Sequence, residues 1–425
     1  MEADIIIVGA GIAGLRCGIE LLHKRPKGSC SIVILEKYKY TGGRVVTYNK
    51  KIEDMDGKCS DVHWENGAGR IHKTHSRVMG LIKNYGLHTF DLDPSKSYLE
   101  DGKLEEDSFS ETLNAILPEI KRLPKDTLQG HTLREILSML LGNDAAHSLL
   151  LQFPYRSEID TMRADMAIRS FEGDMGSDGT FVVVQEGLSA LIAAMVKEFE
   201  KLGGVIFNKQ EVVIVSQNGE KVTLKVKSDA GDVLWKARDV IMAVHADALK
   251  EISAFSGAEC LKHVKMEPLL RCYAVFPVTD GKCWFSDVER VVTPGPLRYF
   301  IPVNAGCGIA MISYTDGVDA RRLMDFVDKH SEAGLGEYLT EALREMFPEK
   351  DIPDPLFFKT HPWTSGCTYW IPGKYDVEAM SKKALRPIES MPGVYCCGES
   401  FSLHQCWMEG ALENADLLLS TYFST

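Results

Sequence analysis

The most constraining feature of the sequence is a glycine-rich turn close to its start. An apolar run at residues 5–8 predicts a buried parallel strand, and the following GAGIAG places glycines at Gly9, Gly11 and Gly14, at the start of a helical pattern. Such glycines allow a tight turn and close approach of a pyrophosphate, and a helix N-terminus offers amide donors and a positive dipole. The pattern predicts a dinucleotide-binding unit and leaves a nicotinamide and a flavin nucleotide equally open.

A second apolar run, at residues 32–35, ends in Glu36. This residue lies about 20 positions after the last glycine, where a carboxylate can accept hydrogen bonds from ribose hydroxyl groups. A carboxylate here also disfavours NADP, because it would face the 2′-phosphate. We therefore expect Glu36 to bind the adenosine ribose of either NAD or FAD.

Length, charge and cysteine content narrow the class of protein. A chain of 425 residues is too long for one ordinary core, so two domains are expected. The net charge of −12 argues against a nucleic-acid or anionic-membrane partner, and no apolar run approaches the ~18 residues of a membrane-spanning helix. The 11 cysteines show no CxxC and no leader-like segment precedes the first strand, so a cytoplasmic protein is expected.

Three further motifs decide between the two nucleotides. Gly42, Gly43 and Arg44 follow Glu36, and near the far end Gly398-Glu399 comes after a short apolar run. The stretch QCWMEGALENADLLL then predicts a helix from about residue 409. Together these motifs resemble the flavin-containing amine oxidase family, which includes monoamine, polyamine and L-amino-acid oxidases. The resemblance spans the chain, is strongest at both ends and near Arg271, is weak in the helical insertion, and implies FAD.

Nucleotide-binding patterns return in mid-chain, with an amphipathic helix ending at Gly203-Gly204 and strands at 205–207, 212–215 and 239–244. Residues 107–151 are instead mostly helical in pattern. We expect an α/β fold, with mixed α+β character, in which a Rossmann-type FAD-binding domain is discontinuous and a substrate domain of mixed sheet and helices is inserted. The predicted boundaries are 1–75, 185–248 and 390–425 for the FAD-binding domain, and 76–184 and 249–389 for the substrate-binding domain.

The resemblance implies roles at matching positions around the cofactor. The helix after Trp407 would direct its N-terminus at the pyrimidine side of the flavin, where a helix dipole stabilises the negative charge of the reduced ring by up to ~2 kcal/mol. The expected cofactor contacts are Gly9, Gly11, Gly14, Glu36, Gly43 and Arg44 for AMP and pyrophosphate, Val212 for adenine, Gly398 and Glu399 for the ribityl end, and Met408, Gly410 and Ala411 for the ring.

On the substrate side, the resemblance makes Trp407 one wall of an aromatic cage that orients the amine beside the flavin. Aromatic faces suit a substrate that arrives in either charge state. The stretch TSGCTYWIPG leaves the opposite wall open between Tyr369 and Trp370. Cys367 lies near the position at which monoamine oxidases tether their flavin, but we do not expect a tether here.

The segment ENGAGRIH resembles the part of L-amino-acid oxidases in which an arginine grips the substrate carboxylate, and that residue here is Arg70. A guanidinium fork matches a carboxylate in shape. The alternative is a structural arginine that bonds backbone carbonyls or FAD. His72 and His75 lack a third ligand at suitable spacing, so no metal site is expected.

One position departs from the family pattern, because Arg271 stands where a lysine usually holds a water at the reactive flavin nitrogen.

We expect an FAD-dependent enzyme that oxidises an amine or L-amino acid to an imine by hydride transfer, with dioxygen as acceptor. Trp407, Arg271, Tyr369 and Trp370 are the expected catalytic residues. A dehydrogenase or desaturase using another acceptor, and a non-catalytic flavin-stabilised interaction protein, stay open. So does the choice between monomer and homodimer, whereas a chromatin demethylase lacks the coiled-coil insertion and basic face.

Overall fold

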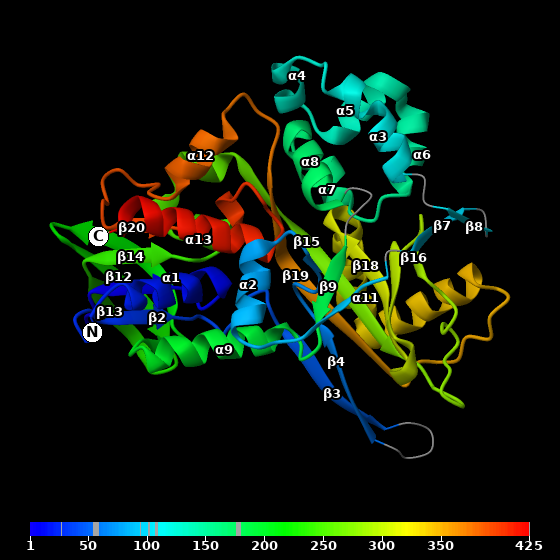
Figure 1. Cartoon of the computed structure of the whole chain (residues 1–425), viewed down its shortest axis with the longest axis horizontal. Coiled ribbons are helices and arrows are strands. Elements are labelled where there is room, and N and C mark those ends of the chain that lie inside the picture. Colours follow the sequence, from blue (N-terminus) through cyan, green and yellow to red (C-terminus); the bar gives the residue numbers. More distant parts are fainter. Residues whose placement is uncertain are drawn as a thin grey trace.

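The computed structural model describes residues 1–26, 28–53, 59–93, 95–100, 103–106, 109–175 and 180–424. A parallel sheet lies at the end that holds both termini (Figure 1). Its two central strands are apolar at every position and buried on both faces, as expected where helices or a second sheet cover each side. Its strand order is β10 (Val205–Phe207), β2 (Ile32–Leu35), β1 (Ile5–Val8), β14 (Asp239–Met242) and β20 (Val394–Cys396).

Alternate residues of β1 face two different cores. Ile5 and Ile7 pack with helices on one face, whereas Ile6 and Val8 pack toward a three-stranded antiparallel sheet on the other. This arrangement follows from the period of two along a strand. The helices are α1 (Ile12–His23), α9 (Leu188–Lys201) and α13 (Met408–Tyr422), and the covering strands are β11 (Glu211–Asn218), β12 (Lys221–Ser228) and β13 (Gly231–Ala237).

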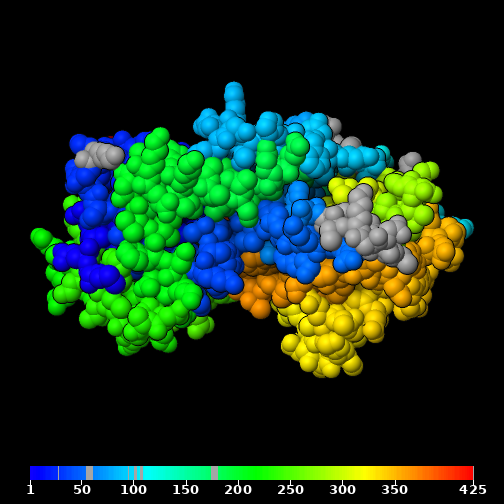
Figure 2. Space-filling model, turned by 90° about the horizontal axis from the view of Figure 1, so that it is seen from below, coloured from blue at the N-terminus to red at the C-terminus, as the bar shows by residue number. Residues whose placement is uncertain are grey.

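A second sheet of seven strands occupies the other end of the molecule. The 30-residue helix α11 (Gly317–Met346) packs against it and bends at Ser331, which has a left-handed φ of 74°. Figure 2 shows the yellow and orange surface of this end beside the blue and green surface of the first. The strand order is β19 (Phe357–Trp370), β15 (Val264–Val275), β18 (Ile309–Asp316), β17 (Tyr299–Asn304), β16 (Arg290–Val292), β7 (Lys96–Glu100) and β8 (Lys103–Glu106).

A group of helices stands beyond this sheet, at the top of Figure 1. Their leucines at three- and four-residue spacing form one buried cluster, and Thr132 and Glu135 cap α5 with reciprocal hydrogen bonds. The group comprises α3 (Phe109–Ile120), α4 (Lys125–Gly130), α5 (Leu133–Leu141), α6 (Asn143–Leu151), α7 (Arg156–Asp160), α8 (Ala164–Ser170) and the π-helical turn η1 (Phe171–Met175).

Short elements connect these units. Among them is a small three-stranded sheet with the strand order β5, β9 and β6. The remaining elements are β3 (Thr47–Glu53), β4 (Cys59–Glu65), β5 (Ile71–His72), β6 (Thr89–Asp91), β9 (Phe181–Val184), α2 (Ser76–Asn84), α10 (Ala246–Lys250), α12 (Val377–Ala384), η2 (Ser253–Phe255), η3 (Glu259–Lys262), η4 (Ala305–Cys307) and η5 (Glu399–Phe401).

The expected fold class, a Rossmann-type α/β unit with an inserted mixed domain, is confirmed. The five parallel strands come from segments assigned to the FAD-binding domain, and the seven strands of the second sheet come from the other segments. The domain boundaries themselves stay a prediction. Three element bounds differ from expectation: β11 runs from 211 to 218, β14 ends at Met242, and α13 begins at Met408 rather than at about residue 409. None of the described helices is long and apolar enough to cross a membrane.

Candidate active site

A cavity of about 390 Å³ is lined by residues from both ends of the molecule. This volume is within the range of small-molecule sites. It brings together Arg70, Arg271, Tyr369 and Trp407, which the sequence singled out as substrate-side residues from four distant segments. Other described residues of the wall are Trp64, Glu65, Tyr155, Tyr273, Tyr314, Asp316, Cys367, Cys406 and Met408.

The glycine-rich turn between β1 and α1 is packed too closely for any side chain at two positions. A Cβ on Gly14 would lie 2.1 Å from the Gly9 carbonyl oxygen, and one on Gly9 would lie 2.6 Å from the carbonyl oxygen of Ala243. Gly9 also has a φ of +105°, which only glycine adopts readily. These two glycines therefore allow the helix to start directly at the end of the strand.

Gly11 and Gly43 differ from them, because they border open space. A Cβ on Gly11 would meet no described heavy atom closer than the Gly42 carbonyl oxygen at 4.0 Å, and one on Gly43 would approach only the Gly11 Cα at 3.8 Å. Gly11 is also the N-cap of α1, so no side chain at that position caps the first-turn amides. Bare backbone facing a helix N-terminus fits the pyrophosphate of a dinucleotide.

Glu36 lies directly beside this turn. Its carboxylate accepts hydrogen bonds from the backbone N–H groups of Ala10 and Tyr38, both at 2.8 Å. Burial raises the pKa of Glu36, while these backbone donors act to lower it. Gln210 donates its N–H to the Glu36 carbonyl oxygen at 2.7 Å, which brings the start of β11 and the buried Val212 next to the ribose position.

Arg44 and Glu399, both predicted cofactor contacts, form an ion pair with each other. Arg44 Nη2 lies 2.8 Å from Glu399 Oε2, and Nη1 donates to the Gly366 carbonyl oxygen at 2.8 Å. Burial opposes the charge of Arg44, but Glu399 raises its pKa. Glu399 also accepts from the backbone N–H groups of Thr368 and Cys406, at 3.1 and 2.8 Å. Both residues come from segments assigned to the FAD-binding domain, and their bonds to Gly366 and Thr368 tie them to β19 of the second sheet.

Gly398 and the first residues of α13 are the remaining expected cofactor contacts. Gly398 has a φ of +134°, and a Cβ there would meet nothing described within 4 Å. Gly410, in contrast, is required by packing, because its Cβ would lie 1.9 Å from the His404 carbonyl oxygen. Trp407 is the N-cap of α13, and it lines the cavity together with Met408, whereas Ala411 is buried one turn further along. An FAD needs bare backbone at its pyrophosphate, a hydrogen-bond acceptor at its ribose and a positive dipole at its flavin ring. These needs would be met by the open glycine backbones, by Glu36 and by the N-terminus of α13.

Trp407 forms an aromatic wall with residues of the β5–β9 region. Phe181 stacks against its ring with 6.0 Å between centroids, and His75 meets it edge-on at 5.0 Å. Tyr369 lines the same cavity. Trp370 does not, because the next residue of a strand points to the other face, and its indole N–H donates to Ser402 O at 2.9 Å in the core. Of the two candidates for the opposite wall, the geometry therefore favours Tyr369.

Arg70 lies among three of these aromatic rings. Its guanidinium carbon is 4.3 Å from the ring centre of Phe181, 5.0 Å from that of Tyr155 and 5.6 Å from that of Trp407. Burial opposes its charge, while nearby tyrosines raise the pKa of Arg70. Stacking on ring faces is compatible with hydrogen bonds from the edge of a guanidinium. Among the described residues, no group of three or more His, Cys, Asp and Glu is placed to hold a metal ion.

Arg271 extends from β15 toward the segment that precedes Arg70. Its Nη1 donates to the Glu65 carbonyl oxygen at 3.1 Å, and its guanidinium lies over Tyr314 at 4.9 Å. A Cβ on Gly69 would be only 3.0 Å from this Nη1. Two guanidinium groups therefore flank the same short stretch of backbone at the cavity wall.

Glu65 is a cavity residue that the sequence analysis missed. Its carboxylate accepts from the Leu188 N–H at the start of α9 at 2.7 Å and from the Thr47 hydroxyl at 3.1 Å. Burial raises the pKa of Glu65 to about 7. The only signal in the sequence is an acid directly before the glycines of ENGAGR, where strand β4 ends at the cavity.

Replacing Glu65 with glutamine is expected to change how stability depends on pH. Because its pKa is raised on folding, the wild-type carboxyl contributes stability below pH 4.5 that is lost as pH rises through about 7. Glutamine accepts the same hydrogen bonds and does not titrate. Thermal unfolding between pH 5 and 8 should therefore show a flatter profile for Glu65→Gln, by on the order of 1–3 kcal/mol across the range. Equal slopes for the two proteins would show that Glu65 is not buried as a neutral acid.

Fold and site together define a dinucleotide-binding enzyme whose substrate cavity adjoins the nucleotide. The chain matches the family of flavin-containing amine oxidoreductases over residues 12–417, and it belongs to that family. The protein is thus an FAD-dependent enzyme of amine oxidation, and the residues described above are those that would hold the cofactor.

Relatives are distant but cover almost the whole chain. It is 22% identical to aplysianin-A of Aplysia kurodai, covering 99% of this chain and 90% of that protein, and 20% identical to polyamine oxidase 1 of Zea mays, covering 98% and 90%. A solved putrescine oxidase with bound putrescine superimposes with a TM-score of 0.73 at 14% identity over the full length of both chains. A variant of that enzyme reaches 0.75 at 15% identity. These structures share the fold.

Proposed function

We propose that the protein oxidises the carbon–nitrogen bond of an L-amino acid to an imine, and that Arg70 binds the substrate carboxylate. Bound FAD supplies the hydride acceptor. The observation that carries the proposal is the placement of the Arg70 guanidinium in the cavity wall, 5.6 Å from the ring centre of Trp407. A carboxylate held there would bring the adjacent α-carbon to the aromatic cage.

The charges of the inner wall support a substrate that carries an anion. Arg70 and Arg271 both line the cavity, and two guanidinium groups repel a substrate whose only charge is an ammonium. Glu65 would act as the base, because a carboxyl with a pKa of about 7 can accept a proton from the substrate ammonium at neutral pH. The amine would then be neutral, as oxidation requires.

A diamine is the second candidate, because the same cavity also has carboxylates. Asp93, Glu158 and Glu289 line it in addition to Glu65 and Asp316. Acidic groups favour a substrate with a second ammonium, and one structural relative is a putrescine oxidase crystallised with putrescine. This candidate needs no carboxylate at Arg70.

Matched pairs of substrates separate the two candidates. L-Ornithine and putrescine differ only in the α-carboxylate, and so do L-leucine and 3-methylbutylamine. The holoenzyme is mixed with each compound without oxygen, and loss of the visible flavin absorption is followed. Bleaching by the amino acids at concentrations well below those needed for the amines supports the proposal. Bleaching by putrescine alone favours the diamine, and bleaching by neither member of either pair contradicts both.

Substitutions of Arg271 can test whether dioxygen is the electron acceptor. An arginine is larger than lysine, planar and permanently charged, so it does not hold a single water as an ammonium does. We propose dioxygen as acceptor and expect a slow reaction of reduced enzyme with it. Arg271→Lys should speed this half-reaction about tenfold in stopped-flow measurements and change reduction by substrate less. Arg271→Gln is the control that removes charge without restoring an ammonium. An unchanged rate in Arg271→Lys would show that this position does not control the oxygen reaction.

A further inference from the structure

The helical group at residues 109–175 reaches the cavity at one short place. Of its described residues, only Tyr155 and Glu158 line the wall. The Tyr155 ring lies 5.0 Å from the Arg70 guanidinium and contacts Tyr314 edge-on at 5.5 Å between centroids. Tyr155 is therefore the aromatic face that this helical group supplies to Arg70.

Tyr155 stands in the joint between α6 and α7, and Arg298 holds the first side of this joint. Its guanidinium donates to the carbonyl oxygens of Leu151 and Leu150, at 3.1 and 3.2 Å, and to that of Phe153. These are carbonyls at the C-terminal end of α6, where a cation is favourable. Arg298 is only 3% exposed and precedes β17, so the contact fixes the helix end to the second sheet.

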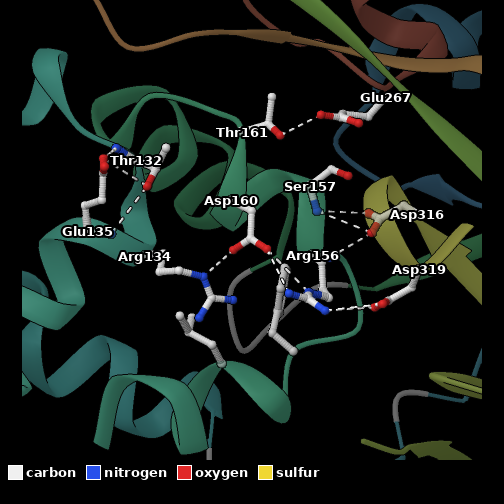
Figure 3. Close-up of polar contacts among 12 residues, drawn as sticks. Thr132, Arg134, Glu135, Arg156, Ser157, Asp160, Thr161, Glu267, Asp316 and Asp319 are labelled. Carbon is white, nitrogen blue, oxygen red and sulfur yellow. Dashed lines mark hydrogen bonds and ion pairs between the residues drawn. The ribbon is translucent and has the colours of Figure 1, made fainter. Parts of the chain in front are cut away.

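Asp316 holds the other side of the joint. Its carboxylate accepts from the backbone N–H groups of Arg156 at 3.1 Å and Ser157 at 3.2 Å, at the start of α7 (Figure 3). Asp316 is the last residue of β18, the neighbour of β17 in the sheet, and it is 5% exposed. Arg298, directly before β17, and Asp316, at the end of β18, thus bond the backbone on the two sides of Tyr155.

Contacts further from the joint have a different character. Arg156 extends its side chain away from the cavity to Asp160 and Asp319, and Arg134 also reaches Asp160 (Figure 3). These ion pairs involve side chains that are between a fifth and a third exposed, so each contributes little on its own. They give natural controls, because Asp319 contacts Arg156 without touching the backbone of the joint.

We propose that Tyr155 determines specificity at the Arg70 carboxylate site, and that Asp316 and Arg298 are positioning residues that hold its ring against the Arg70 guanidinium. The inference rests on the proposed function, since it concerns how Arg70 is kept in place to bind a carboxylate. A guanidinium confined between flat aromatic faces presents its donors in one direction, which gives a bidentate ligand its geometric selectivity.

The contacts of Asp316 also lead us to expect that its role depends on pH. Burial raises the pKa of Asp316 to about 7, against the opposing effects of the Ser157 N–H and Arg298, while Asp319 and Asp160 act in the raising direction. Further ionisable groups near Asp316 are Arg156, from whose backbone N–H it accepts, Tyr369, which interacts with it electrostatically, and Glu158, which lines the same cavity. A negatively charged carboxylate caps a helix N-terminus more strongly than a neutral carboxyl does. The hydrogen bonds from Arg156 and Ser157 to Asp316, which follow Tyr155, should therefore strengthen as pH rises through about 7.

The experiment measures kcat and KM of the holoenzyme for L-ornithine in matched variants. Tyr155→Leu, which removes the ring, should raise KM about tenfold with kcat within twofold, and Tyr155→Phe, which keeps it, should restore the wild-type KM. Asp316→Asn should raise KM about fivefold and abolish the change of KM between pH 6 and 8. Asp319→Asn should leave both constants unchanged at pH 8, where Asp316 is deprotonated in either protein, and should move the change of KM to lower pH because Asp319 raises the pKa of Asp316. FAD content is measured in each variant, so that loss of cofactor is not mistaken for loss of substrate binding.

The double variant Asp316→Asn/Tyr155→Leu decides whether Asp316 acts through Tyr155. Its KM should equal that of Tyr155→Leu alone, whereas multiplied effects would show that the two residues act independently and would overturn the positioning role. A Tyr155→Leu protein with wild-type KM would overturn the specificity role. Arg70→Met separates the two levels of inference. If it raises KM while the Tyr155 variants do not, the carboxylate site stands and this inference fails; if neither responds, the proposed function fails.

Discussion

Replacing Gly14 with alanine is expected to abolish the folded, FAD-bound protein, whereas the same change at Gly11 should give a folded protein that binds FAD poorly. The added Cβ at Gly14 would lie 2.1 Å from a backbone oxygen that cannot move without separating β1 from α1. Overpacking of this kind costs about 1–3 kcal/mol or more. The Cβ at Gly11 enters only the open space between Gly11 and Gly43, where the pyrophosphate would lie, so FAD affinity should fall about 100-fold.

Two measurements separate these outcomes. Bound flavin is quantified by visible absorption after gel filtration, and stability of the apoprotein is measured by thermal unfolding. Gly11→Ala should retain the unfolding temperature of the wild-type apoprotein to within a few degrees. Gly80→Ala is the control, because this glycine lies inside α2 and its Cβ would meet nothing described within 4 Å. Normal FAD binding by Gly11→Ala would show that the open space is not the phosphate site.

The nucleotide-binding half of the fold is predictable from the sequence for a local reason. Residues 5–8 and 32–35 are uniformly apolar, and a strand of this composition is stable only when both faces are covered. The glycines lie directly after the first strand, so sequence spacing alone places them at the helix N-terminus. Glu36 follows from the same reasoning, because it comes directly after Leu35, the residue of β2 in register with Val8, and its carboxylate accepts from the Ala10 N–H.

The cavity wall could be predicted only in part, because it depends on contacts between distant segments. The choice between Tyr369 and Trp370 requires the pleat of β19, whose register against β15 shifts at an irregularity between Glu267 and Leu269. Periodicity in the sequence does not reveal such a shift. Tyr155 lies just beyond the helical segment 107–151, and the backbone around it is bonded by Arg298 and Asp316, which stand some 150 residues later in the chain.

Replacing Arg70 with methionine is expected to raise the KM for L-ornithine on the order of 100-fold and to leave that for putrescine nearly unchanged. A bidentate charged pair with a carboxylate contributes about 1.5–3 kcal/mol or more, and methionine keeps much of the apolar stem of the side chain while removing the guanidinium that lies over Phe181 and Trp407. Removing a positive charge beside the cage should even favour the diamine slightly. Steady-state kinetics on both compounds, with FAD content confirmed, provides the measurement.

The control must remove the same charge from the same cavity at another place. Arg290 meets this requirement, since it lines the cavity from β16 and donates to the Ser95 carbonyl oxygen, outside the aromatic contacts of Arg70. Arg290→Met should change both KM values by small factors, with the KM of putrescine lowered slightly more because the dication gains more than L-ornithine from the loss of a cation in the cavity. If Arg70→Met and Arg290→Met gave the same ratio of KM values for L-ornithine and putrescine, Arg70 would contribute only to the field of the cavity. A loss of discrimination confined to Arg70→Met is the result that a specific carboxylate contact requires, since only a directional guanidinium fork distinguishes two substrates that differ by that one group.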